Sequence, residues 1–397
     1  MIKKRFFHVF LLLSLFLIST TFLPAIIAYG TNPNDPMLLD QWGWYNIYAD
    51  VAYSNGYRGN SSIIVAVIDT GIDLDHPDLQ ANIYTNWAEV NGTPLVDDDG
   101  NGYPDDEHGW NFVIGQNDSD VSDNDGHGSH CAGIIAAIDN TIGVCGIAPD
   151  VTILPLKVIE TESGDLSVLA YAIDYAVMMN ASVISMSIGA SGSTSAINTS
   201  ISNAYAAGIV LVAAAGNDEA ADVSYPADHP DVIAVAAVTK SNEHAPYSNY
   251  GNEIEIAAPG GYSNAIMSTD NEGDYIGNGG TSMATPHVAG VVALIKQWNS
   301  TLTPDQIRQR INDTADDLGT PGKDDYTGAG LINAAGCLGL PKVHTYDPTI
   351  GWLLANLWWI ALIVVGIIIL IIYSVVKKPK TPKYESSSDY SSSPAYY

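Results

Sequence analysis

Four polar residues have the types and local settings that hydrolysis of a peptide bond requires. Asp69 ends the apolar run "SIIVAVIDTG", and His127 lies in "DNDGHGSHCAGIIAA". Asn217 lies in "AAAGND", and Ser282 lies in "GGTSMATPHVAG". A serine hydroxyl becomes a good nucleophile at neutral pH when an imidazole removes its proton, and a buried carboxylate fixes the tautomer of that imidazole. We therefore predict that Asp69, His127 and Ser282 are catalytic.

The tetrahedral intermediate of such a reaction carries an oxyanion, which needs hydrogen-bond donors already in place. Apolar residues recur at helical spacing after Ser282, so Ser282 is predicted to lie at a helix N-terminus. Its backbone N–H and the side-chain amide of Asn217 would then form the oxyanion hole. Each of the four segments alone is equally typical of an ordinary turn or loop, and their combination favours catalysis.

The elements that must position these residues can be read from the apolar runs. Short β-branched runs at 62–69, 151–159, 182–189, 208–216 and 231–238 alternate with helix-like stretches at 130–138, 165–179 and 194–208. This alternation predicts an α/β fold with a parallel sheet and helices on both faces. In such sheets the chemistry lies at the carboxyl ends of the strands, where Asp69 and Asn217 are found.

The four segments, in the order Asp, His, Asn, Ser, resemble the four motif regions of the subtilisin-like serine proteases. In motif details the chain is most similar to the thermitase-like branch of that family. The resemblance covers residues from about 34 to 340. It implies a subtilisin-like fold and an endopeptidase that acts on proteins or peptides through an acyl-enzyme on Ser282, and we expect a monomer.

The resemblance also implies a substrate cleft, in which an extended peptide pairs with one strand and one loop of the enzyme. Asp218 and Glu219 follow Asn217, and they either favour a basic or polar P1 residue or are solvated charges at the rim. The implied cleft residues are Ser187, Ile188 and Gly189 facing Ser163 and Gly164, with Ala214, Ala215 and Gly216 around the P1 pocket.

An acidic stretch, "DDDGNGYPDDEHGW", places oxygen ligands at alternate positions, as in the first half of an EF-hand loop. It lacks the flanking helices and the Glu at the twelfth position, and a plain acidic turn is the alternative. A cluster this dense repels itself without a cation, so we expect Ca2+ here. The expected ligands are Asp97, Asp99, Asn101, the carbonyl of Tyr103, and Asp105 or Asp106.

A second calcium site is implied by the resemblance to the thermitase-like branch alone. In that branch an N-terminal Asp and a loop after the His helix share one ion. Such a site would join the N-terminal segment to the core of the domain. The corresponding residues are Asp35, Asp78 and the Asn140 side chain, with the carbonyls of Ile138, Ile142 and Val144.

Both ends of the chain carry apolar segments that indicate export and membrane attachment. Residues 1–30 read as a secretory signal peptide cleaved near Ala28, with an uncleaved signal anchor as the alternative. After the peptidase domain at 31–340 and a short stalk at 341–351, residues 352–376 are long and apolar enough for one C-terminal transmembrane helix. The lysines after it predict that the disordered tail, 377–397, is cytoplasmic. The peptidase domain would then face outward from the cell membrane.

Only about forty residues separate the predicted cleavage site from Asp69. The family usually carries an inhibitory propeptide in this position, and about forty residues leave no room for one. We therefore expect activity without removal of a prodomain. The formal net charge of −29, from 44 acidic against 15 basic residues, excludes binding to nucleic acid phosphates. Three cysteines imply no disulfide framework.

Two other function classes are weighed against the protease. One is a calcium-stabilised surface binding protein on an inactive subtilase scaffold, but such scaffolds lose a catalytic group and all four are present. The other is an α/β-hydrolase esterase, whose catalytic order is Ser, acid, His and whose serine lies in G-x-S-x-G. Ser282 comes last and lies in Gly-Thr-Ser-Met-Ala, which disfavours that class.

Overall fold

A computed structural model describes residues 33–161, 166–189 and 192–344, together with Ile367 and Leu370. Its centre is a seven-stranded sheet in the order β2-β3-β1-β4-β5-β6-β7, and every pairing in it is parallel. The predicted α/β fold with a parallel sheet is confirmed. The strands are β1 (Ile64–Asp69), β2 (Trp110–Asn111), β3 (Thr152–Lys157), β4 (Val183–Met186), β5 (Val210–Ala214), β6 (Val232–Val238) and β7 (Ile254–Pro259).

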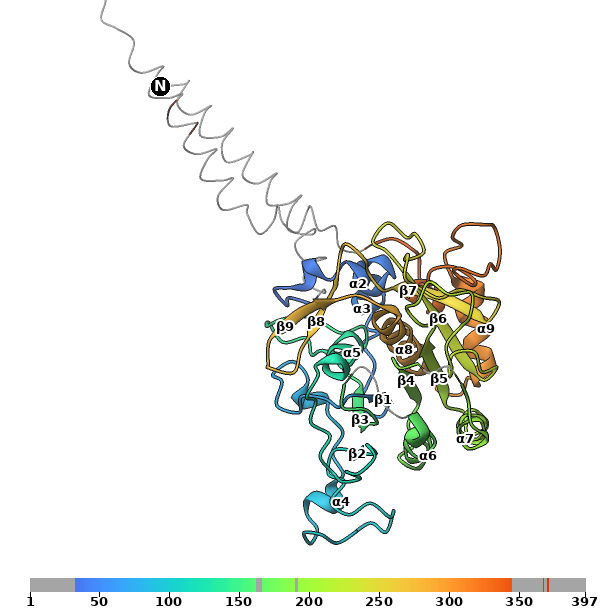
Figure 1. The fold of residues 1–397 in the computed structure, drawn as a ribbon. Helices are drawn as coiled ribbons and strands as arrows, with labels where there is room; N and C mark the ends of the chain where they lie inside the picture. The colour runs from blue at the N-terminus through green and yellow to red at the C-terminus, as the bar shows by residue number, and fades with distance from the viewer. Residues whose placement is uncertain (1–32, 162–165, 190–191, 345–366, 368–369, 371–397) are drawn as a thin grey trace, which may run out of the picture. The chain divides into compact units, whose positions relative to one another are not determined.

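Helices cover both faces of this sheet. Helices α5 and α8 pack together against one face, and α6 and α7 pack together on the other (Figure 1). The central strands are therefore buried almost completely, which explains their unbroken apolar sequence. The longer helices are α5 (His127–Ala136), α6 (Leu169–Met178), α7 (Ser195–Ala206), α8 (Thr281–Trp298) and α9 (Pro304–Thr314).

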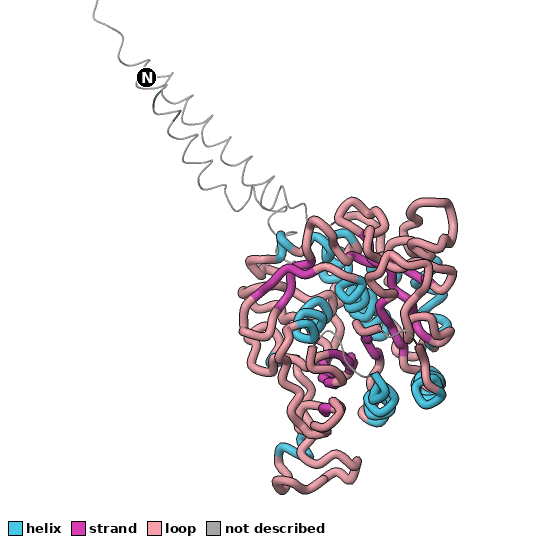
Figure 2. Tube along the Cα trace, viewed as in Figure 1, coloured by secondary structure: helices cyan, strands magenta, loops and turns pink. Residues whose placement is uncertain are grey.

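Short helical segments and long loops connect these layers, and the loops make up much of the tube in Figure 2. The α-helical segments are α2 (Trp42–Asn46), α3 (Ala49–Ser54), α4 (Trp87–Val90) and α10 (Ala334–Cys337). The 3-10 segments are η1 (Leu38–Asp40), η2 (Gln80–Asn82) and η3 (Leu166–Val168).

Strand β1 occupies the position in the sheet that matters most for the site. It lies between β3 and β4. After β1 the chain forms β2 and β3 on one side of it, and then β4 to β7 on the other side. The carboxyl end of a strand at such a switch point opens into a crevice, because the following connections leave in opposite directions. Asp69 is the last residue of β1.

Four strands have no counterpart among the predicted ones, namely β2, β7, β8 and β9. Strand β7 carries a charged residue, Glu255, within its apolar sequence, and this interrupts the pattern of a buried strand. The antiparallel pair β8 (Ile266–Thr269) and β9 (Tyr275–Asn278) forms a separate two-stranded sheet against α5. This hairpin contributes one wall of the cleft described below.

The described residues include no helix that is both long enough and apolar enough to cross a membrane. The span predicted at 352–376 lies outside the described residues, apart from Ile367 and Leu370. The predicted signal peptide and cytoplasmic tail also lie outside them. The three cysteines are free and buried.

Candidate active site

Asp69 and His127 meet at the carboxyl end of β1. Nδ1 of His127, the first residue of α5, lies 2.6 Å from Oδ1 of Asp69, whose side chain is 1% exposed. The backbone N–H of Thr70 donates to the same oxygen at 2.8 Å. The imidazole is thus held by a buried carboxylate, which is the arrangement that fixes its tautomer and leaves Nε2 for proton transfer.

The electrostatics around His127 favour its charged form. Burial on its own lowers the pKa of His127, but Asp69, Asp125 and Asp123 together raise that pKa to about 9. Asp69 contributes both its charge and its hydrogen bond. These carboxylates therefore stabilise the imidazolium that forms when the serine is deprotonated.

Ser282 is the second residue of α8 and is half-buried. Its backbone N–H is one of the first N–H groups of the helix, which have no intrahelical acceptor and can face a ligand. Its hydroxyl donates to the carbonyl of Ser187 at 3.1 Å, and in this rotamer it makes no hydrogen bond to His127. Both residues line one cleft, and a side-chain rotation of Ser282 would direct the hydroxyl to the imidazole.

Pro286 shapes the first turns of α8 around the nucleophile. A proline has no N–H, so the carbonyl four residues earlier, that of Ser282, loses its helical donor. The hydroxyl of Ser187 donates to this carbonyl at 2.8 Å, and the thiol of Cys131 lies 3.5 Å from it. The freed carbonyl thereby ties Ser282 to β4 and α5.

Asn217 is oriented by Thr281. The backbone N–H and the hydroxyl of Thr281 both donate to Oδ1 of Asn217, each at 2.9 Å. Because the amide oxygen is fixed by two donors, the amide nitrogen must point the other way, toward the cleft that Asn217 lines. Asn217 is therefore positioned as an oxyanion donor beside the N–H of Ser282.

The cleft that contains these groups has a volume of about 680 Å3. Of the predicted substrate-binding residues, Ser187, Ile188 and Gly189 line it, and Ser163 and Gly164 lie outside the described residues. Ala214 and Ala215 are only 4% and 0% exposed and line neither this cleft nor its neighbour, so they support the wall from behind. Residues that the sequence did not single out also line the cleft: Asp125, Asp270, Asn271, Glu272 and Ile276.

A second cavity of about 440 Å3 adjoins the cleft, with which it shares Gly189 and Asn217. Gly216, predicted at the P1 pocket, lines this cavity. This cavity therefore lies beside Asn217, the predicted oxyanion donor. The cavity also carries three carboxylates, those of Asp218, Asp222 and Asp228, and Glu219 is not among its lining residues.

The remaining histidines near the site have structural partners. Nε2 of His130 lies 3.1 Å from the carbonyl of Ile266 and 3.2 Å from that of Ile276, and it bridges β8 and β9. Burial lowers the pKa of His130 to about 4 and that of His287 to about 4, so both are neutral at working pH. Nε2 of His76 lies 3.0 Å from the carbonyl of Asp274.

The acidic loop at 97–106 is closed around its own carboxylates. Oδ1 of Asp97 accepts from the N–H groups of residues 100 and 101, and Asn101 donates to Asp99 and Asp106. Oxygens of Asp97, Asp99 and Glu89 lie within 4.8 Å of one another. Glu89 is buried and was not predicted, although "WAEVNG" places an acid shortly before the loop.

The other predicted ligands in this loop differ in their placement. Asp106 is fully buried, and burial raises the pKa of its carboxyl group. Oδ2 of Asp105 accepts from the N–H of Leu95 instead of facing Asp97. The N–H of Tyr103 donates to Oδ1 of Asn101, which keeps that chain segment beside the carboxylates.

A second group of buried oxygens lies where the N-terminal segment meets the loop after α5. Asp35 and Asp78 are 4% and 0% exposed. The side chain of Asn140 donates to Asp78 at 2.6 Å, and its backbone N–H donates to Asp35 at 3.1 Å. Oδ2 of Asp35 is buried without a partner, and burial, Asp139 and Asp78 raise the pKa of Asp35 to about 6. The other residues predicted here are Ile138, whose N–H donates to the Asp78 carbonyl, Ile142, whose N–H donates to Asn140, and Val144, whose N–H donates to Asp78.

The fold and the site together define a serine hydrolase built on a parallel α/β sheet. A sequence model described as the subtilase family matches residues 60–330. A thermostable alkaline protease of Halalkalibacterium halodurans is 41% identical over 294 residues, which cover 74% of this chain and 72% of that protein. Subtilisin E of Bacillus subtilis is 40% identical over 297 residues (74% and 69%), and a subtilisin of Bacillus pumilus is 39% identical over 297 residues (74% and 96%). The chain therefore belongs to the subtilase family and is a subtilisin-like serine endopeptidase.

Loss of the Asn217 amide should slow the chemical step while leaving substrate binding intact. We expect Asn217→Leu to lower kcat by about 10²–10³ with little change in KM, a magnitude taken over from the loss of an oxyanion donor in a subtilisin. Steady-state hydrolysis of a chromogenic peptide measures both constants. Ser282→Ala provides the blank, since it should also lose labelling by a fluorophosphonate probe. A KM that rises as much as kcat falls would place Asn217 in ground-state binding instead.

Proposed function

We propose that this endopeptidase is a calcium-stabilised enzyme anchored in the cell membrane, with its peptidase domain outside the cell. The observation that carries the hydrolytic part is that His127, Asn217 and Ser282 line one cleft, and that the buried Asp69 holds His127 by a hydrogen bond. The substrates would be proteins or peptides that enter this cleft in an extended form along Ser187 to Gly189. No step in the reaction requires a metal ion, so calcium would act on stability.

Two groups of residues fit calcium because each brings together carboxylates whose negative charges are not neutralised. Asp35 and Asp78 are buried close together, and one carboxylate oxygen of Asp35 has no partner among the described residues. Buried like charges are destabilising unless a cation neutralises them. Glu89, Asp97 and Asp99 offer a second convergent set. Calcium in the first group would support the proposed membership of the thermitase-like branch.

Removal of calcium should lower the stability of the domain. At free calcium about 100 times the Kd of a site, binding adds about 2.7 kcal/mol to the free energy of unfolding. We expect EDTA to lower the Tm measured by calorimetry and excess CaCl2 to restore it. Asp35→Asn and Asp97→Asn should each remove part of the calcium response, whereas Asp305→Asn, in α9 and away from both groups, should retain all of it. An unchanged Tm in EDTA would refute the proposal.

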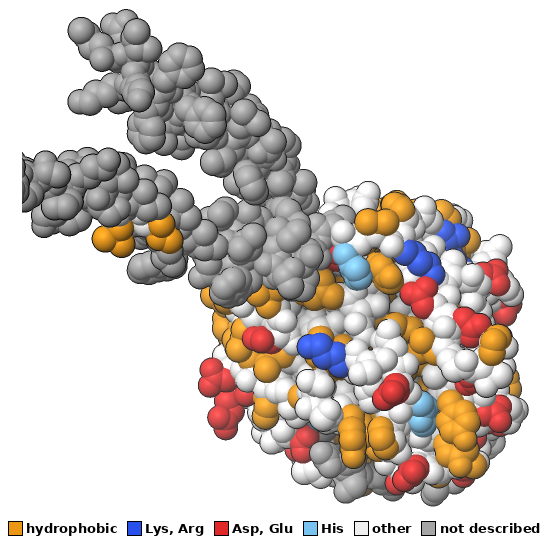
Figure 3. All heavy atoms as spheres, turned by 90° about the horizontal axis from the view of Figure 1, so that it is seen from above, with side chains coloured by type: hydrophobic (Ala, Val, Ile, Leu, Met, Phe, Trp, Pro, Cys, Tyr) orange, Lys and Arg blue, Asp and Glu red, His pale blue; other side chains and the backbone are white. Residues whose placement is uncertain are grey.

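The membrane part of the proposal depends on the sequence of the two terminal segments. Residues 352–376 are long and apolar enough to cross a hydrocarbon layer of about 30 Å, and lysines follow them. The acidic domain before the stalk suits an aqueous, calcium-containing exterior. Figure 3 shows acidic side chains scattered over one face of the domain with few basic ones between them.

Deletion of the C-terminal segment should separate attachment from catalysis. We expect the full chain to stay with the membrane fraction after carbonate extraction, and a chain ending at residue 340 to be released into the medium in active form. N-terminal sequencing of both products tells a cleaved signal from an uncleaved anchor. Release of the full chain without truncation would argue against the anchor.

The adjoining cavity gives an expectation for the P1 residue. Its three carboxylates face a shared space, and no Lys or Arg is among its described lining residues. Burial is the main cause that raises the pKa of Asp228; His229 lowers this pKa, and Glu253 and Asp222 raise it further. Three carboxylates without a basic side chain in the described lining would give the cavity a negative potential. A cationic P1 side chain would relieve this potential.

Peptides that differ only at P1 should therefore be cleaved in order of charge. We expect kcat/KM to be about tenfold higher for Lys than for Met at P1, and lower again for Glu, because partly exposed charge pairs contribute about 0.2–1 kcal/mol each. The preference should shrink at high salt and in the double variant Asp222→Asn, Asp228→Asn. Asp305→Asn is the control for net charge. Equal cleavage of the Lys and Met peptides would contradict the expectation.

A further inference from the structure

Asp123 is a buried carboxylate next to the catalytic pair, and its side chain makes no hydrogen bond to the imidazole of His127 or to Ser282. It lies in the loop before α5, is 7% exposed, and has no Lys or Arg partner among the described residues. A buried anion without a cation must be stabilised by hydrogen bonds, and the hydrogen bonds of Asp123 indicate what its carboxylate does here.

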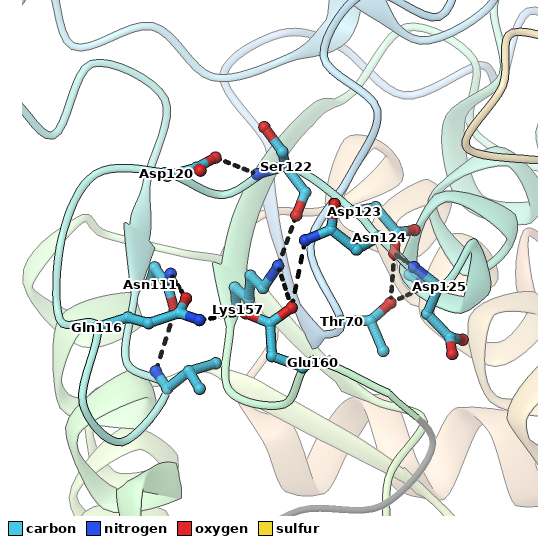
Figure 4. A network of polar contacts seen from close by, with 12 residues as sticks. Thr70, Asn111, Gln116, Asp120, Ser122, Asp123, Asn124, Asp125, Lys157 and Glu160 are labelled. Carbon is cyan, nitrogen blue, oxygen red and sulfur yellow. Dashed lines mark hydrogen bonds and ion pairs between the residues drawn. The ribbon is translucent and has the colours of Figure 1, made fainter.

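The hydrogen bonds of Asp123 reach both segments that form the catalytic pair. Its Oδ1 accepts from the hydroxyl of Thr70 at 2.8 Å and from the N–H groups of Asp125 and Gly126 at 3.0 and 2.9 Å. Its Oδ2 accepts from the N–H and the hydroxyl of Ser129 at 2.9 and 2.7 Å. Figure 4 shows Asp123 between Thr70 and the backbone near Asp125.

Thr70 completes the connection on the side of the strand. It follows Asp69 directly, and its N–H donates to the same Asp69 oxygen that contacts His127. Its hydroxyl donates to Asp123 and accepts from the N–H of Gly128 at 2.9 Å. Gly128, which follows His127, is thus bonded directly to Thr70, and Gly126, which precedes His127, is joined to Thr70 through Asp123.

Asp123 also replaces a missing helix cap. The residue before α5 is Gly126, whose φ of +98° suits glycine and which has no side chain to cap the helix. The carboxylate of Asp123 takes the N–H of Ser129 in the first turn, where a negative charge is favoured by the helix dipole. On the other side of the loop, the buried Lys157 donates to the carbonyl of Ser122 at 2.7 Å, which restrains the residue next to Asp123 (Figure 4).

We propose that Asp123 is a positioning residue for the catalytic base: it joins the end of β1 to the first turn of α5, and its negative charge stabilises the imidazolium of His127 during attack. The inference rests on the catalytic roles given above to Asp69, His127 and Ser282. A purely structural role would hold the turn but would not change the proton affinity of His127.

The charged and titratable groups around His127 must be considered together in a test by pH. Asp69 and Asp125 also favour the imidazolium, and His130 and Cys131 are kept neutral by burial, which lowers the pKa of the first and raises that of the second. Across the cleft, the hairpin turn carries further carboxylates. Among the described residues, these groups are Asp69 on β1, Asp123 and Asp125 on the loop, His130 and Cys131 on α5, and Asp270 and Glu272 on the β8–β9 turn.

The experiment compares pH profiles of kcat/KM for the full chain and three variants. The neutral imidazole is the active form, so activity should rise with pH through the pKa of His127, which lies above 6.5 in the unmodified protein. Asp123→Asn keeps the shape of the side chain, removes its charge and keeps an acceptor at only one of the two oxygen positions, so the rising limb should move to lower pH by about 0.5–1 unit. Asp123→Ala also removes the hydrogen bonds, and its plateau kcat should fall by about tenfold at unchanged KM.

Asp120→Asn is the matched control, because Asp120 lies in the same loop and likewise accepts from a backbone N–H two residues on, but does not contact Thr70 or α5. We expect its profile to coincide with that of the unmodified protein. The proposal is overturned if Asp123→Asn leaves the rising limb in place, or if Asp120→Asn moves it equally. If Asp123→Ala does not fold, the limb of Asp123→Asn decides. Fluorophosphonate labelling of the unmodified protein shows separately whether the catalytic assignment itself holds.

Discussion

The hydrogen bond between His127 and Asp69 is the contact on which the rest of the site depends, because it joins the central strand to the first turn of α5. The two segments must approach closely for it to form. A Cβ on Gly128 would lie 2.1 Å from the carbonyl oxygen of Gly71 and 3.2 Å from Cβ of Asp69, so no larger residue can follow His127 in this arrangement. The sheet supplies the acid, and the glycine lets the helix bring the base to it.

The acidity of the chain is accommodated in a consistent way. Carboxylates such as the half-buried Asp97 and the buried Asp123 are surrounded by backbone N–H groups of tight turns, which are donors that carry no compensating charge. Such turns fix loop geometry strongly, but they leave the net negative charge in place. Where several carboxylates meet and one oxygen remains without a donor, as at Asp35, a cation would complete the set. The same chemistry therefore both orders the loops around the active site and creates the sites where calcium would bind.

The positions of residues that end an apolar run could be predicted from the sequence. Side-chain orientations and contacts between distant segments could not. The parallel strands that end at Asp69 and shortly before Asn217 follow from unbroken β-branched segments, because burial on both faces leaves that pattern. Strand β7 was missed because Glu255, on that strand, pairs with Arg308 and so interrupts the apolar pattern. Glu89 was missed because it comes from a helix outside the acidic loop that it joins. Contacts between segments far apart in sequence have no local pattern to reveal them.

The orientation of the Ser282 hydroxyl was also beyond the sequence, and its consequence can be bounded. The hydroxyl donates to the carbonyl of Ser187, and Ser187 donates back to the carbonyl that Pro286 leaves free. Turning the hydroxyl to His127 exchanges one neutral hydrogen bond for another, and a lone bond of this kind contributes about 0.5–1.5 kcal/mol. The resting rotamer can therefore slow attack by at most about tenfold, while the reciprocal bond from Ser187 keeps the backbone of Ser282 in place. The helix turn that carries Ser282 is thus held in place, and only the side-chain torsion of Ser282 has to change for attack.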